Sequence, residues 1–424
     1  MHGAWSFRLK ILIIADGPVP HPYMNYRADP LAKYLSYKGY NVSVLCPKPT
    51  PAKVMNARGF DDVDFIYVPR YKSIHRPVDL TQRSYQIVSL VKKLRTLITK
   101  RKYDVIRPIS FIPAWTSIMA SYGLNPSAPI VTNLSDFYSD LYKQFNLPFS
   151  SSVTKFLRKM ESSIVRKSDV FIVDTPTQRK YWKHWGLDEK RCVVLPHGLP
   201  RSFSCDSQKS EAKLNVRMKY GIGTDTKIIF YIGDVSQLDG LDILIAATPA
   251  IIKENENVKF MIIGSGTEEY MKKLKKQIRE SAMERYFIFV HRIPHFQVPE
   301  FIATADVCVA PFRFTLTSNS SVPNKILEYI AIKKPVVATA GDGLKETLGD
   351  VIKYVEPENP QMLACAILDI LKDGSFVRRS RDKMETVIDK LNWRNIIQRE
   401  ELIIRAALNH NVQDFRIFDY RLHD

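Results

Sequence analysis

Two charged residues that lie three positions apart, Lys325 and Glu328, have the chemistry to bind a phosphorylated ligand. They belong to the stretch 319–330, which we expect to form a loop and a short helix, followed by a turn and a buried strand at 335–339. Both side chains then project from one face near the positive end of the helix. A helix N-terminus with a nearby lysine binds a phosphate or diphosphate, and a carboxylate one turn deeper accepts hydrogen bonds from a diol such as that of ribose. The alternative is an ordinary surface pair worth ~0.3 kcal/mol.

The residues before Lys325 suit the start of a helix. Pro323 is favoured in the first helical turn, where its missing N–H costs no hydrogen bond. Asn319, Ser320 or Ser321 could cap the first amides. We therefore expect Pro323 inside the first turn and a side-chain cap.

A second candidate for phosphate binding is the link 233–242, which joins a strand at 227–233 to the next helix. Gly233 and Gly240 flank this link. Glycines at such a turn let backbone amides approach a phosphate closely. The alternative is a plain turn that requires positive φ.

These stretches belong to a chain in which strands and helices alternate, with continuous apolar runs typical of parallel strands buried on both faces. The expected strands are 8–15, 40–46, 65–68, 105–107, 130–132, 170–173, 193–198, 227–233, 259–264, 286–290, 307–310 and 335–339. The expected helices include 25–37, 82–100, 153–167, 267–280 and 393–408. The alternation predicts an α/β fold with two doubly wound parallel sheets.

The chain has 424 residues, which is enough for two domains. The polar stretch 199–225 has little periodicity and is typical of an interdomain connection. Five scattered cysteines, none in a C-x-x-C pair, argue against a disulfide framework or a zinc site. No apolar run approaches the ~20 residues of a membrane span, so we expect a cytoplasmic protein.

The net charge of +18 is concentrated in the first half of the chain. Residues 1–200 contain 30 Lys and Arg against 14 Asp and Glu, whereas residues 201–424 contain 32 against 30. This imbalance indicates an anionic partner for the first half, either an anionic lipid surface or a nucleic acid. A surface charge that only aids solubility is the alternative. No helix-turn-helix, RRM or finger pattern supports a nucleic-acid partner, so we expect none.

The stretch from Ser321 to Thr339 resembles the nucleotide-sugar segment of retaining GT-B glycosyltransferases of the family 4 group, which reads S-V-P-x-K-x-x-E-Y-x-A-x-x-K-P-V-V-A-T. The resemblance covers about 8–408 and is strongest over 227–355. It implies two Rossmann-like domains, an acceptor domain at 1–200 and a nucleotide-sugar donor domain at 201–392, with a cleft between them. It also implies that the C-terminal segment 393–424 begins with a helix that crosses back to the first domain.

The resemblance assigns donor binding to residues of the second half. These are Gly233, Gly240, Arg292, Ser321, Val322, Asn324, Lys325 and Glu328. Many relatives carry Arg just after the first glycine and Lys just before the second, where this chain has Asp234 and Asp239. The usual Glu eight residues before Glu328 is Ser320. Lys325 is therefore the expected catalytic cation, and the amides around Ser321, Val322 and Asn324 could hold the sugar and phosphate.

In the first half, the family often places a histidine near 105–110 and another after the strand at 130–131. This chain has Arg107 and Ser110 in the first place and Asp136 in the second. Asp136 could accept a proton from the acceptor hydroxyl, or it could simply form a turn. Arg27 matches a position where relatives commonly have Arg and could contact an anionic acceptor.

The resemblance implies a hexosyltransferase that moves a sugar, with retention, from a nucleotide-diphosphate sugar to a glycan or lipid-linked acceptor. We expect no metal and no cofactor besides the donor. Asp62-Val63-Asp64 is a D-x-D sequence, but it precedes a strand and is interpreted as an acidic turn. A GT-B-fold binding protein that has lost its activity is one alternative, and a nucleic-acid binder is another.

The basic first half suggests how such an enzyme reaches its acceptor. We expect it to attach peripherally to an anionic membrane face through the helix 153–167, which has basic and apolar residues side by side. The basic residues are Lys155, Arg158, Lys159, Arg166 and Lys167. The apolar residues are Val153, Phe156, Leu157, Ile164 and Val165.

Overall fold

The structure is a computed structural model that describes residues 8–19, 27–48, 60–69, 80–124, 128–143, 150–199, 203, 210–409 and 412–420. The chain forms two compact units. Unit 1 contains the described residues from Arg8 to Pro196 and from Arg394 to Tyr420, and unit 2 contains those from His197 to Trp393. The boundaries expected at 200 and 392 lie within a few residues of these.

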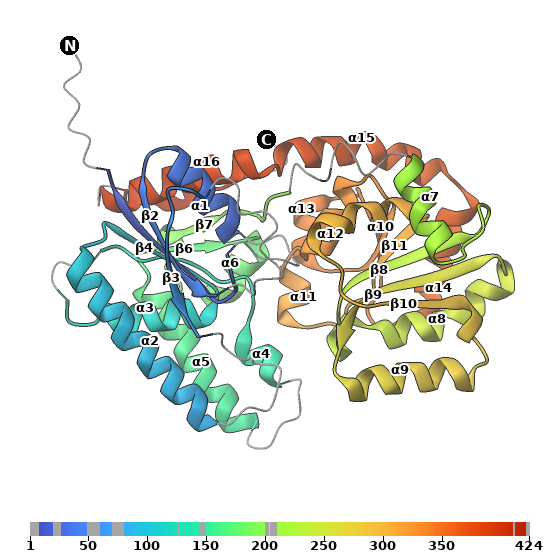
Figure 1. Ribbon diagram of the computed structural model, residues 1–424, viewed down its shortest axis with the longest axis horizontal. Coiled ribbons are helices and arrows are strands. Elements are labelled where there is room, and N and C mark those ends of the chain that lie inside the picture. The colour runs from blue at the N-terminus through green and yellow to red at the C-terminus, as the bar shows by residue number, and fades with distance from the viewer. Residues whose placement is uncertain are drawn as a thin grey trace, which may run out of the picture. The chain divides into compact units, whose positions relative to one another are not determined.

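Unit 1 is built on a seven-stranded parallel sheet in the order β3-β2-β1-β4-β5-β6-β7 (Figure 1). Its strands are β1 (Lys10–Ala15), β2 (Asn41–Pro47), β3 (Asp64–Val68), β4 (Val105–Ile109), β5 (Val131–Asn133), β6 (Val170–Val173) and β7 (Cys192–Val194). Its helices are α1 (Ala28–Tyr37), α2 (Leu80–Arg101), α3 (Phe111–Ser121), α4 (Tyr138–Lys143), α5 (Ser150–Lys167), α6 (Pro176–Lys183) and most of α16 (Trp393–Leu408). The chain order reverses between β1 and β4, which are neighbours in the sheet.

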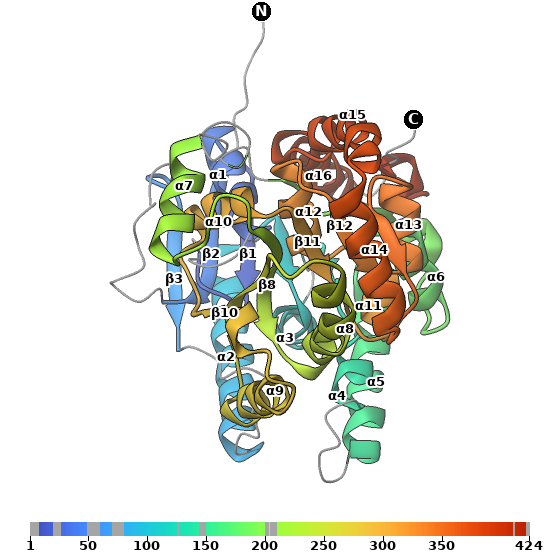
Figure 2. The same cartoon turned by 90° about the vertical axis from the view of Figure 1, so that its right-hand side faces the viewer.

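Unit 2 repeats this plan with a six-stranded parallel sheet in the order β10-β9-β8-β11-β12-β13 (Figure 2). Its strands are β8 (Lys227–Val235), β9 (Val258–Gly266), β10 (Phe287–Val290), β11 (Val307–Ala310), β12 (Val336–Thr339) and β13 (Lys353–Val355). Its helices are α7 (Ser210–Lys219), α8 (Leu241–Glu254), α9 (Glu268–Glu280), α10 (Val298–Thr304), α11 (Leu316–Ser320), α12 (Asn324–Ala331), α13 (Asp342–Leu348), α14 (Pro360–Lys372) and α15 (Ser375–Lys390). The predicted α/β fold with two doubly wound parallel sheets is confirmed.

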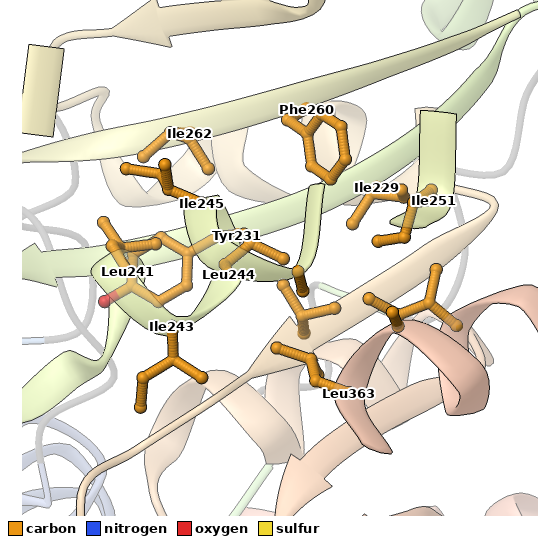
Figure 3. Packing of buried hydrophobic residues seen from close by; sticks show 14 of the residues in the cluster. Ile229, Tyr231, Leu241, Ile243, Leu244, Ile245, Ile251, Phe260, Ile262 and Leu363 are labelled. Atoms are coloured by element: carbon orange, nitrogen blue, oxygen red, sulfur yellow. The ribbon is translucent and has the colours of Figure 1, made fainter. Parts of the chain in front are cut away.

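The core of unit 2 lies between its sheet and the helices α8 and α14 (Figure 3). Ile229 and Tyr231 of β8 and Phe260 of β9 pack against Leu244 of α8, and all four are fully buried. Burying an aliphatic or aromatic side chain of this size contributes about 1.5–3 kcal/mol. This packing fixes the carboxyl end of β8 relative to the start of α8.

Helix α16 is attached to unit 1 by a buried ion cluster around Glu400, which is fully buried. The Arg107 side chain donates to Glu400 Oε1 through Nε at 2.8 Å, and Arg27 donates to Oε2 at 3.2 Å. Arg27 also donates to the carbonyls of Leu195 and Pro196 at 2.9 and 2.8 Å. The expectation that Arg27 contacts an acceptor is therefore wrong, because its guanidinium is buried and bonded within the protein.

Several local features of the structure differ from what the sequence predicted. The stretch 199–225 includes the helix α7, which was not expected there. Its residues 200–202 and 204–209 lie outside the described part of the chain, as do residues 20–22 of the loop after β1. The helix expected from residue 25 begins at Ala28, with Arg27 as its N-cap residue, and residues 25 and 26 lie outside the described part of the chain.

Candidate active site

The residues that could bind a ligand in unit 2 meet at the carboxyl ends of β8 and β11. These strands are neighbours in the sheet although β9 and β10 lie between them in the chain. Ligands of open α/β sheets bind at such a reversal of strand order, beyond the carboxyl ends. Helix α12, which follows β11 in the chain, supplies Lys325 to this edge.

The Lys325 ammonium is held by side chains from three neighbouring segments. Its Nζ donates to Tyr231 Oη at 2.8 Å and to Asp239 Oδ1 at 2.9 Å. It also lies 4.3 Å from the ring centre of Tyr231 and 4.6 Å from that of Phe312. Because an ammonium has three N–H groups, these bonds leave one for a ligand.

Asp239 is the acid of this arrangement, and its carboxylate is itself firmly held. It ends the short 3₁₀ helix η4 (Gln237–Asp239), where Oδ2 accepts from Ser236 N at 3.3 Å and from Ser236 Oγ at 2.6 Å. Oδ1 accepts from Tyr231 Oη at 2.9 Å. Burial first, and then the Asp239 charge, raise the pKa of Tyr231 well above its ordinary value, so that the phenol stays a donor.

Gly233 is required where Lys325 crosses β8. A Cβ atom at this position would lie 2.6 Å from Lys325 Nζ, and the backbone has φ +145°, which disfavours other residues. The turn expected at Gly233 is absent from this described segment, because β8 continues to Val235 and pairs with β9 as far as Gly266.

Gly240 has the positive φ of the plain turn that was the alternative to phosphate binding at this link. It begins α8 with φ +69°, and a Cβ atom there would lie 1.8 Å from the carbonyl oxygen of Pro311. Gly240 therefore allows the start of α8 to pass close to the segment after β11. Gly240 thus supports the site through its backbone conformation.

The start of α12 differs from the prediction in two ways. Pro323 is the N-cap residue rather than part of the first turn, and its own side chain makes no capping hydrogen bond. The hydroxyls that were expected to cap it point backwards: Ser320 donates to Leu316 O at 2.6 Å and Ser321 to Thr317 O at 2.7 Å. The helix therefore presents its positive end without a capping hydrogen bond from its N-cap side chain.

Three other residues around this helix start were predicted to help hold the ligand, and each has a different setting in the structure. The Ser321 amide donates to Thr317 O at 2.9 Å, so the expectation that it holds a ligand is wrong for this conformation. The Val322 side chain is buried. Asn324 is the first residue of α12 and lies beside Lys325 in the chain.

Glu328 lies one turn further along α12 and has a partner that was not predicted. Its Oε1 is 2.8 Å from Nε2 of His295, in the short helix η6 (His295–Gln297). The His295 ring in turn lies 5.1 Å from the ring centre of Phe203. A carboxylate has two oxygens, so Glu328 retains acceptor capacity for a diol.

Arg292 lies at the edge formed by β8 and β9. Its Nε donates to Ser265 Oγ at 2.8 Å, and its guanidinium forms an ion pair with Asp234. Both charged side chains are about half exposed or more, at 49% and 67%. Because exposed pairs are worth ~0–1 kcal/mol, Arg292 can exchange Asp234 for an anionic ligand at little cost.

In unit 1, the predicted Asp136 follows β5 at the carboxyl edge of the sheet. Burial is the main cause that raises its pKa to about 6, and the neighbouring charges of Asp174 and Asp16 add to it. Nearby, Ser110 has φ +83° and its Oγ lies 2.9 Å from Tyr138 Oη. Strained backbone of this kind concentrates at functional sites.

The helix proposed to contact a membrane is only partly available for that purpose. Ile164 and Val165 are buried in unit 1, so the second half of α5 faces the core. In the first half, Phe156 is 60% exposed and the neighbouring Lys155 and Lys159 are exposed as well. Across the described helices, none is long and apolar enough to span a membrane.

Several residues of this site escaped the sequence analysis. Tyr231 reads as a core strand residue, Phe312 lies in a loop, and His295 had no motif to mark it. Asp239 was noticed only as a departure from the expected lysine. Among the described residues, no group of three or more His, Cys, Asp or Glu is arranged to hold a metal.

Comparison with protein families matches both halves of the chain. Residues 25–203 match the family described as Glycosyltransferase Family 4, and residues 226–373 match the family described as Glycosyl transferases group 1. The second match contains Gly233, Lys325 and Glu328.

Individual proteins agree with these matches. An uncharacterized glycosyltransferase of Methanocaldococcus jannaschii is 24% identical over 82% of this chain and 87% of its own. The sucrose-phosphate synthase of Thermosynechococcus elongatus has the same fold, with a TM-score of 0.78 at 17% identity over 95% of this chain and 100% of that one. HepE of Anabaena, solved with UDP and glucose, has a TM-score of 0.72 at 16% identity over 94% and 100% of the two chains.

Proposed function

Because the chain belongs to the GT-B glycosyltransferases, with a family 4 domain followed by a group 1 domain, we propose that it moves a sugar from a nucleotide-diphosphate sugar. We further propose that the anomeric configuration is retained, that no metal or other cofactor takes part, and that the acceptor is a glycan or a lipid-linked sugar.

The observation that carries this proposal is the position of Lys325. Its ammonium lies at the carboxyl edge of the unit 2 sheet, beside the start of a helix whose N-cap side chain makes no capping hydrogen bond. A diphosphate there accepts from the ammonium and from the first amides of α12, and meets the positive end of the helix dipole. We propose that Glu328, one turn deeper, accepts from a ribose diol.

UDP is the first nucleotide to test. HepE of Anabaena, whose fold is similar over nearly the whole chain, was solved with UDP. The similarity supports UDP as a probe, and the choice of base and of sugar is left to the experiment below.

The chemical step follows from electrostatics. As the glycosidic bond to the donor breaks, negative charge grows on the leaving diphosphate, and Lys325 with the helix N-terminus stabilises that charge. The acceptor hydroxyl attacks the same face from which the diphosphate leaves, and the leaving phosphate takes its proton. Asp136, with a pKa near 6, is a carboxylate at neutral pH and is the alternative acceptor of that proton.

We propose that unit 1 reaches its acceptor by peripheral attachment to an anionic membrane surface. The first half of α5 would make the contact, with Phe156 entering the interface and Lys155 and Lys159 meeting the head groups. A vesicle sedimentation assay tests this. Sedimentation with anionic but not neutral vesicles is expected, and equal binding to both would contradict it.

A second candidate is a binding protein on the same fold that has lost turnover. The ion pair between Lys325 and Asp239 favours it, because an acid at 2.9 Å opposes the approach of a diphosphate. Such a protein would still bind a nucleotide but would not release it from a nucleotide sugar.

The test uses the full chain with a panel of nucleotides and nucleotide sugars. UDP, GDP, ADP and TDP are screened by thermal shift, and the corresponding nucleotide sugars are then assayed for release of the nucleoside diphosphate. An enzyme stabilised by one nucleotide and releasing it from that donor is expected. Stabilisation without release would favour the binding protein, and neither response would refute both.

A further inference from the structure

The Lys325 ammonium already has an internal acid beside it. Its Nζ is 2.9 Å from Asp239 Oδ1, and the two side chains are only 12% and 11% exposed. We propose that Asp239 is an internal counter-ion of Lys325, which positions the ammonium at the end of β8 and weakens its attraction for a bound diphosphate. This inference rests on the proposed function, because it assigns a regulatory role within the same site.

Asp239 is fixed too firmly to leave when a ligand arrives. Its Oδ2 accepts two hydrogen bonds from Ser236, at 3.3 Å from N and 2.6 Å from Oγ. Its Oδ1 lies 2.9 Å from the buried Tyr231 phenol, whose single proton is shared between Asp239 and the Asp234 carbonyl oxygen at 2.5 Å. Since the two Ser236 bonds do not involve Lys325, the carboxylate stays in place whether or not the ammonium has a second partner.

The Lys325 ammonium is equally restricted. The rings of Tyr231 and Phe312 lie 4.3 and 4.6 Å from Nζ, where cation–π attraction holds an ammonium. The Gly233 backbone lies against it so closely that a Cβ atom there would be 2.6 Å away. A diphosphate must therefore share an ammonium that remains where Asp239 holds it.

This arrangement has a consequence for turnover. Interactions that are equally strong before and during reaction do not speed the chemical step, and strong binding of the product slows its release. An acid beside Lys325 reduces the attraction for the bound nucleotide product while keeping the ammonium aimed at the leaving group. Removing the acid should therefore tighten nucleotide binding and slow turnover at the same time.

The experiment compares the wild type with Asp239→Asn. We expect UDP to bind about 5–10-fold more tightly to the variant, since removing one charge near a partly buried cation changes an interaction of this order. Turnover with the nucleotide sugar should fall in the same variant. A residue that merely supports the fold would instead weaken binding and turnover together.

Two further variants make the result specific. In the Lys325→Ala background, Asp239→Asn should give no gain in UDP affinity, because the two residues act as a coupled pair. Asp242→Asn is the matched control. The Asp242 carboxylate of α8 accepts hydrogen bonds from Arg313 at 2.5 Å and from Tyr270 Oη at 3.2 Å, and not from Lys325. It should leave the UDP affinity unchanged.

Unchanged or weaker UDP binding by Asp239→Asn would overturn the inference, as would a gain that persists without Lys325. If Asp239→Asn does not fold, Asp239→Ser removes the same charge with a smaller polar side chain and is read by the same criteria. If the wild type binds UDP and Lys325→Ala weakens it, yet neither Asp239 variant tightens it, only this inference fails. If no nucleoside diphosphate binds the wild type, the proposed function fails with it.

Discussion

Each unit places an acid against a cation, but the ion cluster of unit 1 is fully buried, whereas the ion pair of unit 2 lies at the edge of its sheet. In unit 1, Arg27, Arg107 and Glu400 are between 0 and 1% exposed, and Arg27 is also bonded to backbone carbonyls. In unit 2, Lys325 and Asp239 are 12% and 11% exposed, at the edge of the sheet and beside a helix start whose N-cap side chain makes no capping hydrogen bond. The first cluster joins α16 to the sheet, whereas the second retains an N–H that a ligand can use.

The difference shows that the number of charges along a chain is a poor guide to their use. Residues 1–200 carry most of the excess positive charge, yet two of their arginines neutralise a buried acid. Unit 2 has almost balanced charge and contains the cation to which we assign catalysis. What distinguishes the two is exposure: the arginines are buried together with their acid, whereas the Lys325 ammonium lies at the edge of the sheet with one N–H left for a ligand.

The largest effect is expected from breaking the buried cluster. Glu400→Ala removes the acid that the two buried guanidinium groups share and leaves Arg27 only Asp174 at 3.5 Å, which should lower the free energy of unfolding by about 3–5 kcal/mol. Urea denaturation measures this. Glu401→Ala is the control, because Glu401 accepts from the half-buried phenols of Tyr34 and Tyr40 at 2.9 and 2.6 Å and should cost much less. Equal losses for the two variants would contradict the distinction.

The next effect is expected on catalysis. Lys325→Ala removes the cation that stabilises the leaving diphosphate and should lower kcat by about 10²–10³-fold. Its free energy of unfolding should also fall, because the Asp239 carboxylate, only 11% exposed, loses its cation, so kcat is compared on protein shown to be folded. Lys353→Ala, which removes a surface lysine paired with Asp369, is the matched control for a lost charge in the same unit. If kcat fell by less than about threefold in Lys325→Ala, the proposed role of Lys325 would be contradicted.

The acid of unit 1 offers a test by pH. If Asp136 accepts the proton, turnover should fall about tenfold per pH unit below pH 6, because the raised pKa leaves the carboxyl protonated there. The same pKa shift also affects stability. Because the folded state favours the protonated carboxyl, the contribution of Asp136 to the free energy of unfolding is fully present below the ordinary pKa of an aspartate and is lost as the pH rises through about 6.

Asp136→Asn should abolish this acid limb of the rate profile together with most of the activity. Glu161→Gln is the control. Burial raises the pKa of Glu161 to about 7 as well, but this acid lies on α5, where it accepts from the Ser139 amide, and we assign it no proton transfer. A profile unchanged by Asp136→Asn would show that the leaving phosphate takes the proton itself.

A smaller effect is expected for recognition of the ribose. If Glu328 accepts from the diol, the wild type should prefer UDP over 2′-deoxy-UDP by about tenfold, since a hydrogen bond to a charged group contributes about 1.5–3 kcal/mol. Glu328→Ala should remove most of this preference. His295→Ala should reduce it in part, because His295 holds one oxygen of Glu328 at 2.8 Å. A preference that survives Glu328→Ala would place the ribose elsewhere.

The sequence predicted those features that depend on local pattern. The buried strands β11 and β12 were recognised from apolar runs, and the placement of Lys325 and Glu328 on one short helix followed from their spacing. The long segment that resembles a known family is the sequence basis on which we propose the donor site in unit 2.

Features that depend on distant contacts could not be predicted in this way. Arg107 meets an acid 293 positions later in the chain, so its buried role is invisible to any local pattern. Asp239 lies 86 positions before Lys325, and the sequence showed only that it replaces an expected lysine. The missing N-cap hydrogen bond of α12 also depended on the fold, because Ser320 and Ser321 are drawn back to the carbonyls of α11.

The most direct measurement is a crystal structure of the protein with UDP bound. It should show a phosphate oxygen within hydrogen-bond distance of Lys325 Nζ, with Asp239 still on the other side of the ammonium and the phosphate next to the first amides of α12. UDP bound elsewhere in unit 2, with the Lys325 ammonium contacting only Tyr231 and Asp239, would contradict the account.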